Sequence, residues 1–283
     1  MKKILLTGSS GFLGSVVLKE LSKKNIVYFI SRKKIPNSKV KKNTKQIYYK
    51  DYSQLDLKLK KIKIDIVIHC ATHYAKKHDK YDIEKFSDSN LIFGNILLEN
   101  LKKMSVKTFI NFSTVWENYN GINDNFYNLY SVYKRNFSNL ILYYKRLNSK
   151  INFFNLFLSD TFGEFDKRPK IINILKTNYK GNKVSKIISS KLFINLINVI
   201  DIINAIDIIL RNNIKHGDYN QFKTKDISVH ELVKKFNSKN KKKLKIKWLS
   251  KKIIKDKIFK KKILRNWIPK NSNINNIIDA IRR

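Results

Sequence analysis

Short apolar runs alternate with segments of helical periodicity through the first half of the 283-residue chain. Apolar runs of strand length occupy residues 4–6, 26–30, 47–49, 65–69 and 108–112, and helical patterns occupy residues 16–21, 83–103 and 127–147. Strands that alternate with helices in this way predict an α/β fold with a doubly wound parallel sheet. In such a sheet the carboxyl ends of the strands meet at one edge, where ligands bind.

The strongest local signal is the octapeptide Thr7-Gly8-Ser9-Ser10-Gly11-Phe12-Leu13-Gly14, which directly follows the first apolar run. Three of the chain's 8 glycines occur in it, at steps of three. Glycines at this spacing permit a tight turn, a close approach of the backbone to a pyrophosphate, and close packing of the next helix on the strand. The amino end of that helix offers free N–H groups and a positive dipole end to phosphate. The octapeptide therefore predicts a dinucleotide site.

The second half of the chain is less regular. Beyond about residue 156 it contains one helical segment at 171–179 and several short strands. We therefore expect a Rossmann-type nucleotide-binding domain at residues 1–155 and a smaller substrate-binding lobe at 156–283, partly interleaved with the sheet. The longest apolar stretch, residues 192–210, is interrupted by asparagines and aspartates and is too polar for a membrane span.

The end of the second predicted strand bears on the choice of dinucleotide. Enzymes that use NAD usually place an acidic side chain there to bind the 2′-hydroxyl of the ribose. This chain has Ser31, Arg32 and Lys33 instead, which suit a 2′-phosphate. We therefore expect NADP as the cofactor, with NAD as the alternative.

Tyr130 and Lys134 are the candidate catalytic pair, because they open the helical segment that follows the fifth strand. Residues four apart share one face of a helix, so both side chains can point at a nicotinamide ring. A neighbouring ammonium group favours tyrosinate, so we expect Lys134 to lower the pKa of Tyr130 and to make its phenol useful in proton transfer near neutral pH. Thr114, at the end of the fifth strand, is expected to hydrogen-bond the reacting oxygen, with Ser113 as the alternative.

Composition narrows the class of protein. The net charge is +39, and this basicity would favour non-specific phosphate binding. The lysines are nevertheless spread over the whole chain, which indicates a compositional bias at solvent-facing positions. We expect no specific nucleic-acid partner, and a non-catalytic RNA-binding protein of the same fold remains the alternative from another class.

The cysteine and histidine residues bear on the cellular compartment and on whether the protein binds a metal. The single cysteine, Cys70, allows no intramolecular disulfide, and no signal-peptide pattern is visible. We therefore expect a cytoplasmic protein. The five histidines and the cysteine have no metal-ligand spacing, so we expect no metal, and His69 is expected to be a buried packing residue.

In their order along the chain, these features resemble the extended short-chain dehydrogenase/reductase family, in particular its NAD(P)-dependent nucleotide-sugar epimerases, dehydratases and reductases. The similar segments run nearly from end to end: 7–14, Asp51 after the third strand, His69-Cys70-Ala71-Thr72 after the fourth, Asn90 in the next helix, Ser113 and Thr114, Tyr130 with Lys134, Asp160-Thr161-Phe162-Gly163, Val199-Ile200-Asp201 and Trp267-Ile268-Pro269-Lys270.

The resemblance implies roles for individual residues. It places Asp51 at the adenine, Ala71 and Thr72 in the cofactor cleft, and Asp160 at the nicotinamide or sugar. The implied substrate contacts are Thr114, Trp116 and Asp160. The implied cofactor-binding set is Thr7, Gly8, Ser10, Gly11, Phe12, Leu13, Gly14, Ser31, Arg32, Asp51, Tyr52, Cys70, Ala71, Thr72, Asn90, Tyr130 and Lys134. The resemblance further implies a homodimer through the helices that hold Asn90 and Tyr130.

Within that family, segments 109–116, 128–130 and 160–170 are most similar to the CDP-abequose synthase-like 4-ketoreductases. That similarity implies NADPH-dependent reduction of a nucleotide-linked 4-keto-6-deoxyhexose, in surface polysaccharide (lipopolysaccharide) synthesis. Dehydratases of the family carry an Asp-Glu pair where this chain has Val115 and Trp116, which argues against dehydration. A nucleotide-sugar 4-epimerase remains the alternative, because it uses the same hydroxyl, tyrosine and lysine.

The chain also departs from the family at two places. Ile194 stands where epimerases of the UDP-galactose type carry an arginine for the substrate diphosphate, and Tyr219-Asn220-Gln221 lacks the usual following glycines. Because of these departures, the sequence does not identify the residues that contact the nucleotide base and the diphosphate of the substrate.

Overall fold

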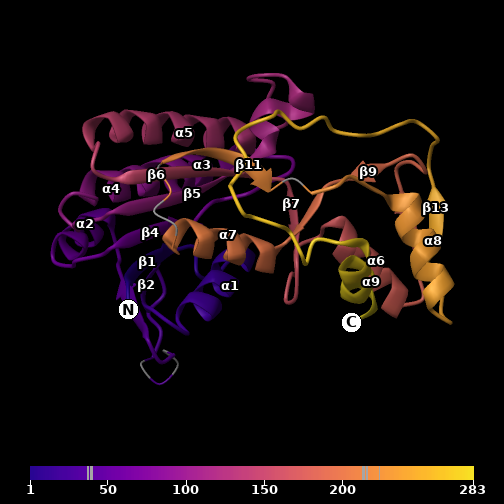
Figure 1. Cartoon of the computed structure of the whole chain (residues 1–283), viewed down its shortest axis with the longest axis horizontal. Helices are drawn as coiled ribbons and strands as arrows, with labels where there is room; N and C mark the ends of the chain where they lie inside the picture. Colours follow the sequence, from indigo (N-terminus) through magenta and orange to yellow (C-terminus); the bar gives the residue numbers. More distant parts are fainter. Residues whose placement is uncertain (37, 39–40, 212–213, 215, 223) are drawn as a thin grey trace.

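A sheet of seven parallel strands forms the centre of the computed structural model, in the order β11-β6-β5-β4-β1-β2-β3 (Figure 1). The strands are β1 (Lys3–Thr7), β2 (Ile26–Ser31), β3 (Thr44–Tyr48), β4 (Ile66–His69), β5 (Thr108–Thr114), β6 (Asn152–Leu158) and β11 (Gly217–Phe222). The structure describes residues 1–36, 38, 41–211, 214, 216–222 and 224–283. The chain adds strands outward from β1 in both directions, so the crevice beyond the carboxyl ends of β1 and β4 is the switch point where this fold binds ligands.

Helices cover both faces of the sheet, and the alternation of side chains along β1 accounts for both layers. Ile4 and Leu6 are buried with α1 (Phe12–Leu21) and α7 (Val199–Arg211). Leu5 points to the opposite face, which is covered by α2 (Tyr52–Lys60), α4 (Phe93–Asn100) and α5 (Leu129–Leu147). The expected doubly wound architecture is confirmed.

The predicted helix at 83–103 contains a feature that periodicity does not reveal. It forms α3 (Lys80–Ser87), a π-helical turn η2 (Asp88–Ile92) and α4 in direct succession. Asp79 starts α3 by accepting hydrogen bonds from the backbone N–H groups of Tyr81 and Asp82. A π turn inserts an extra residue into the helix and commonly lies at a functional site. Here it carries Asp88 and Ser89 to the wall of the cavity described below.

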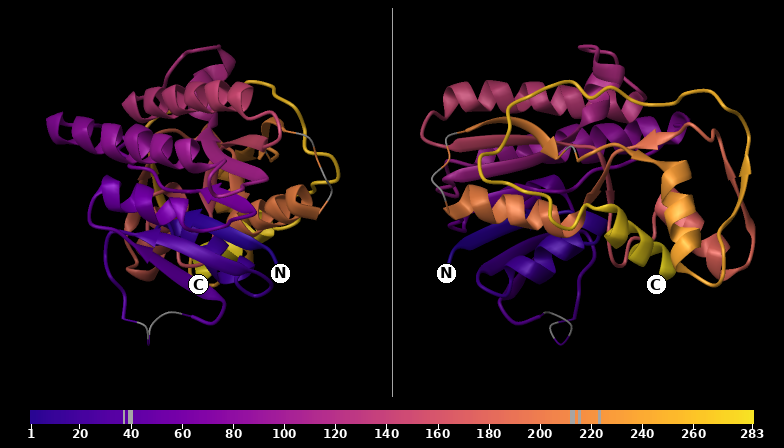
Figure 2. Two further views of the ribbon diagram at one scale, coloured as in Figure 1. Left: turned by 90° about the vertical axis from the view of Figure 1, so that its left-hand side faces the viewer. Right: turned by 45° about the vertical axis from the view of Figure 1, so that its right-hand side comes forward.

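A smaller lobe has its own apolar core, which includes Phe162, Leu175, Leu232 and Ile277. Its helices are α6 (Ile171–Lys180), α8 (Val229–Lys239) and α9 (Ile274–Arg282). Its strands form three short pairs from β7 (Asp160–Phe162), β8 (Val184–Ile187), β9 (Phe193–Ile194), β10 (Leu196–Asn198), β12 (Ile227–Ser228) and β13 (Lys245–Trp248). Because α7 and β11 return to the large sheet, the chain passes between the two parts more than once (Figure 2).

A C-terminal segment, residues 249–273, ties the lobe to the sheet. In Figure 1 it runs from β13 across the molecule and back to α9. Trp267 is buried in the core of the α1 and α7 face, and its indole N–H donates to the Asp201 carbonyl at 2.8 Å. The buried Asp201 carboxylate accepts from the backbone N–H of Asn271 at 2.9 Å and from the Ser272 hydroxyl at 2.6 Å. Trp267 is thus a packing anchor between the C-terminal segment and α7.

The helices of the described residues were also searched for membrane spans. Among them, no helix is both long enough and apolar enough to cross a bilayer.

Asp201→Asn should loosen this junction, because the anionic acceptor of several buried hydrogen bonds is lost. We expect a loss of about 2 kcal/mol in the free energy of unfolding, measured by urea titration. Asp207→Asn on the same helix is the matched control, since its ion pair with Arg211 is exposed and should contribute less than about 1 kcal/mol. Equal losses in both variants would contradict this assignment.

Candidate active site

A backbone hydrogen bond, rather than a side chain, closes the turn between β1 and α1. Gly8 has a φ of +68°, and its carbonyl accepts a hydrogen bond from the Gly11 N–H at 3.0 Å. Gly11 precedes the helix with no capping side chain, and the first turn of α1 contains no acidic residue. The amino end of α1 is therefore open to an anionic ligand, as a pyrophosphate site requires.

Two of the glycines are required by close backbone approach. A Cβ on Gly8 would lie 2.6 Å from the Ala71 nitrogen, and a Cβ on Gly14 would lie 2.0 Å from the Gly8 carbonyl oxygen. The first contact sets the distance between the turn and the end of β4, and the second sets the packing of α1 on the turn. The cradle fits the pyrophosphate of a dinucleotide, because no side chain caps the N–H groups at the amino end of α1.

Thr7 fixes the same junction from inside the protein. Its hydroxyl accepts a hydrogen bond from the Ala71 N–H at 3.1 Å and forms a second hydrogen bond with His69 Nδ1 at 2.9 Å. Burial, aided by the charge of Lys134, lowers the pKa of His69 to about 3, so the ring is neutral and its Nδ1 can serve as the partner of Thr7. His69 is buried among Phe93, Phe109 and Phe137, as the sequence predicted.

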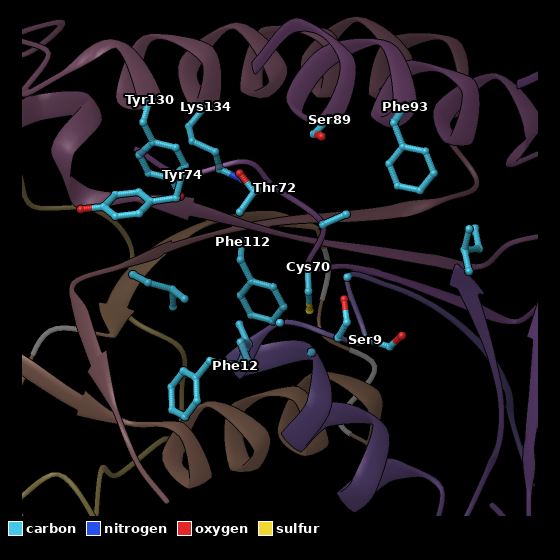
Figure 3. A pocket seen from close by; sticks show the side chains of 18 of the residues that line it. Ser9, Phe12, Cys70, Thr72, Tyr74, Ser89, Phe93, Phe112, Tyr130 and Lys134 are labelled. Carbon is cyan, nitrogen blue, oxygen red and sulfur yellow. The ribbon is translucent and has the colours of Figure 1, made fainter. Parts of the chain in front are cut away.

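A cavity of about 750 Å³ extends from the glycine turn to α5 and the lobe (Figure 3). This volume is within the range typical of ligand sites. The residues predicted from the sequence that line it are Gly8, Ser10, Gly11, Phe12, Leu13, Gly14, Ser31, Arg32, Tyr52, Cys70, Ala71, Thr72, Thr114, Trp116, Tyr130, Lys134 and Asp160. The fold thus brings together residues from nearly the whole first half of the chain and from the start of the lobe.

Three residues of the predicted cofactor-binding set do not line this cavity. Thr7 is buried at the strand junction, and Asp51 is exposed at the start of α2, where it accepts from the Gln54 N–H at 2.8 Å. Asn90 is buried in the π turn. Its amide accepts from the His73 N–H at 2.6 Å and donates to the His73 carbonyl at 3.1 Å. All three thus support the backbone around the cavity.

Tyr130 and Lys134 point from α5 into the cavity side by side (Figure 3). The helix begins at Leu129 because the Asn128 side chain accepts from the Ser131 N–H at 3.1 Å and the Ser131 hydroxyl reaches back to the Asn128 backbone. This capping box places Tyr130 in the first turn, facing the cavity. Tyr74, which the sequence did not single out, packs edge-on against the Tyr130 ring at a centroid distance of 5.1 Å.

The expected acidification of Tyr130 is wrong for this structure. Burial raises the pKa of Tyr130 above its ordinary value of 10.0, and a hydrogen bond with Thr72 opposes the rise only in part. Burial also lowers the pKa of Lys134 to about 8, with Glu117 and Cys70 opposing. The reason is desolvation, which disfavours the charged form of both groups and outweighs their neighbours. The phenol therefore holds its proton as a donor should.

The two hydroxyls at the end of β5 differ in their partners. The Ser113 hydroxyl donates to the Glu117 carboxyl group, so its proton is directed away from the cavity. Thr114 Oγ1 accepts from the Trp116 N–H at 3.3 Å and keeps its own proton for another acceptor. Both line the cavity, but this pattern favours Thr114 over Ser113 as a donor to a ligand oxygen.

One end of the cavity is aromatic and carries a paired arginine. Tyr49 stacks with Tyr52 and Phe93 at centroid distances of 6.0 Å and 6.2 Å. Arg32 Nη1 lies 3.4 Å from the Asp88 carboxylate, which also accepts from the Tyr52 hydroxyl. Asp88 comes from the π turn, so the sequence pattern gave no reason to place it beside β2.

The opposite end of the cavity is formed by the lobe. Lys170 Nζ lies 2.9 Å from the Asp160 carboxylate and 4.9 Å from the centre of the Trp116 ring. Burial would lower the pKa of Lys170, but Asp160 and Tyr74 outweigh it, so the pKa is raised and the side chain is a cation. Arg168 lies over the Phe12 ring at 4.4 Å and is not among the residues that sequence reasoning assigned to the site.

The family profile described as "NAD dependent epimerase/dehydratase family" matches residues 4–221. Among curated proteins, the CDP-abequose synthase of Yersinia pseudotuberculosis is 30% identical over 220 residues, which cover 77% of this chain and 75% of that protein. The CDP-abequose synthase of Salmonella muenchen is 24% identical over 219 residues, covering 77% and 73% of the two chains.

Solved structures agree in fold. MoeE5 in complex with UDP-glucuronic acid and NAD has a TM-score of 0.78 at 18% identity, with 99% of each chain covered. UDP-glucuronic acid 4-epimerase from Bacillus cereus in complex with NAD has a TM-score of 0.77 at 20% identity, with 99% of this chain and 96% of that chain covered. Both chains superpose over the sheet and the lobe together.

Gly14→Ala should disrupt the cradle, because the new Cβ would overlap the Gly8 carbonyl. Relief of such an overlap costs about 1–3 kcal/mol, so calorimetry with NADP⁺ should give at least about fivefold weaker binding. Gly181→Ala is the control, since its Cβ would lie at an ordinary 3.4 Å from the Thr177 carbonyl. Unchanged binding by the Gly14 variant would contradict the assignment of the pyrophosphate site.

Proposed function

Because the chain belongs to the NAD-dependent epimerase/dehydratase family, we propose that it reduces a nucleotide-linked 4-keto-6-deoxyhexose with NADPH. The observation that carries the proposal is the convergence of Thr114, Tyr130 and Lys134 on the cavity that begins at the glycine turn. The 30% identity to a CDP-abequose synthase supports a CDP-linked sugar and a role in surface polysaccharide synthesis.

The residues suited to hold the cofactor divide by position. The turn from Gly8 to Gly14 would hold the pyrophosphate, the Tyr49, Tyr52 and Phe93 rings would pack near the adenine, and Lys134 would bind the nicotinamide ribose. NADPH bound in this way supplies the hydride. Ser31, Arg32 and Lys33 line the cavity at the end of β2 and support the preference for a 2′-phosphate.

In the proposed reaction the protein handles the proton. Thr114 donates a hydrogen bond to the C4 carbonyl oxygen and holds it beside Tyr130. As the hydride reaches C4, Tyr130 gives its phenolic proton to the developing alkoxide. The ammonium group of Lys134 stabilises the tyrosinate that remains, until solvent returns a proton. The burial of Thr114 and Lys134 around the half-buried Tyr130 ring strengthens these interactions.

The exposed apolar side chains on the outer helices support the proposed homodimer. Ile83 on α3, Ile92 in the π turn, and Leu142 and Tyr143 on α5 are exposed. These helices pack against one another on one face of the sheet, so a second copy would bury this surface in a bundle of helices.

The activity is tested by incubating the protein with NADPH and CDP-, dTDP- and UDP-linked 4-keto-6-deoxyhexoses. The proposal predicts loss of NADPH absorbance in step with formation of the 6-deoxyhexose, fastest with one nucleotide. Conversion of a nucleotide sugar without net consumption of cofactor would point instead to a 4-epimerase.

Tyr130→Phe should lower kcat by about 10²–10⁴-fold, because the proton donor is lost. The binding of NADP⁺ should change by less than about threefold, since the ring still fills its place beside Tyr74. Tyr133→Phe on the same helix is the control, because that hydroxyl pairs with Ser87 outside the cavity. Full activity of the Tyr130 variant would exclude Tyr130 as the donor.

Arg32→Ala should reduce kcat/KM for NADPH by about tenfold and leave the value for NADH nearly unchanged, because a charge-assisted contact to the 2′-phosphate is lost. Lys34→Ala, a neighbouring exposed lysine that does not line this cavity, serves as the comparison. An equal loss with both cofactors would argue against the proposed preference for NADPH.

A further inference from the structure

Glu117 is a buried acid behind the cavity wall that the proposed reaction does not use. It lies in the 3₁₀ segment η3 (Val115–Gly121) after β5, and its side chain is 0% exposed. One carboxyl oxygen accepts hydrogen bonds from the Ser113 hydroxyl and, at 3.4 Å, from the Ser138 hydroxyl. Within the described residues the other oxygen has no hydrogen-bond partner, and Arg135 Nη1 lies 3.8 Å from it. Such burial is costly unless a nearby charge offsets it.

Three cations act on this carboxyl group. Lys134 and Arg135 come from α5, and Lys261 comes from the C-terminal segment. Arg135 and Lys261 each have a second carboxylate within reach, on Asp124 and Asp218 respectively. Glu117 is the first of the acids that act on Lys134, and the other titratable groups near Lys134 are Tyr130 on its own helix and Cys70 and His69 at the end of β4.

The surroundings hold Glu117 in place. Ser138 lies one turn after Lys134 on α5, and its hydroxyl also donates to the Lys134 carbonyl at 3.0 Å. Ser138 in turn accepts from the Asn155 amide at 2.9 Å, and Asn155 accepts from the Asn111 amide at 2.7 Å. Asn111 and Asn155 are register partners on β5 and β6, so the network is anchored in the sheet. The carboxyl group is therefore fixed relative to both Ser113 and Lys134.

We propose that Glu117 is a positioning residue of the active site, whose carboxyl group keeps Lys134 in the ammonium form and turns the Ser113 hydroxyl proton away from the cavity. The inference deepens the proposed function and rests on it. Glu117 acts through Lys134, which stabilises the tyrosinate, and through Ser113, which leaves Thr114 as the hydroxyl donor to the substrate oxygen.

The titration of the two groups agrees with this geometry. Burial raises the pKa of Glu117 to about 8, and Lys134, Arg135 and Lys261 oppose the rise. Burial lowers the pKa of Lys134 to about 8, and Glu117 is the first of the groups that oppose the fall. Each group therefore stabilises the charged form of the other against desolvation. When the Glu117 carboxyl group is removed, fewer groups oppose the effect of burial on Lys134, so the pKa of Lys134 falls further.

Glu117→Gln keeps the shape of the side chain and removes its charge. In the keto-sugar assay the high-pH limb of the kcat profile should move to lower pH by about one unit, while KM for NADPH stays within about twofold. Asp201→Asn is the matched control, since it removes a buried carboxylate away from the cavity and should leave that limb in place. The inference is overturned if the high-pH limb of the kcat profile stays in place in Glu117→Gln. It is also overturned if the limb moves equally in both variants.

A second measurement does not depend on enzymatic activity. Thermal unfolding of the wild type, Glu117→Gln, Lys134→Met and the double variant forms a cycle that measures their coupling at each pH. Because the folded-state pKa of Glu117 is raised, its contribution to stability is full below 4.5 and is lost as the pH rises through about 8. The wild type should therefore lose stability relative to Glu117→Gln over that range. In the Lys134→Met background the loss should extend to higher pH and be larger in total, because Lys134 no longer lowers the pKa of Glu117. Additive effects at every pH overturn the inference.

The two measurements separate the failure of the inference from that of the proposed function. A wild type that converts no keto-sugar refutes the function, and the unfolding cycle still decides whether Glu117 and Lys134 are coupled. An active wild type with an additive cycle and an unmoved profile refutes the role of Glu117 alone.

Discussion

The close approach of the glycine turn after β1 to the end of β4 determines where every other part of the site can lie. Gly8 leaves no room for a side chain against Ala71, and the buried Thr7 hydroxyl ties the ends of both strands together. This contact lies at the switch point of the sheet, so the crevice opens between α1 on one side and the π turn and α5 on the other. The cavity in that crevice extends from the aromatic end at Tyr52 to the Tyr130 phenol.

The sheet and the helix that holds Tyr130 and Lys134 could be predicted from the sequence, because both depend on local signals. Period-two alternation places Ile4 and Leu5 on opposite faces, and the glycine octapeptide has strand before it and helix after it. Contacts between segments that are far apart in the chain could not be predicted from the sequence. The π turn packs beside α5 and brings Asp88 to Arg32, and just before it Phe86 of α3 stacks with Tyr133 of α5. Glu117 also escaped notice, because nothing in its local sequence indicates burial beside Lys134.

The predicted pKa of Tyr130 failed for a related reason. The spacing of Tyr130 and Lys134 is readable from sequence, but the depth of their burial is a property of the whole fold, and desolvation decides the outcome. The structure also shows how the acids and cations of a chain with a net charge of +39 are arranged at the cavity. Three of the cations that line the cavity are paired with acids: Arg32 faces Asp88, Lys170 faces Asp160, and Arg168 faces Asp166. These three acids limit the free positive charge at the cavity, while most lysines are exposed to solvent.

The central claim is that Tyr130 gives a proton while a hydride passes from the cofactor to C4 of the sugar. The most direct measurement uses NADPH deuterated at the transferable position, with the product sugar examined by NMR. The account predicts one deuterium at C4, oxidised cofactor in equal amount, and loss of this transfer in Tyr130→Phe. A product without deuterium, or one formed while the cofactor remains reduced, would contradict it.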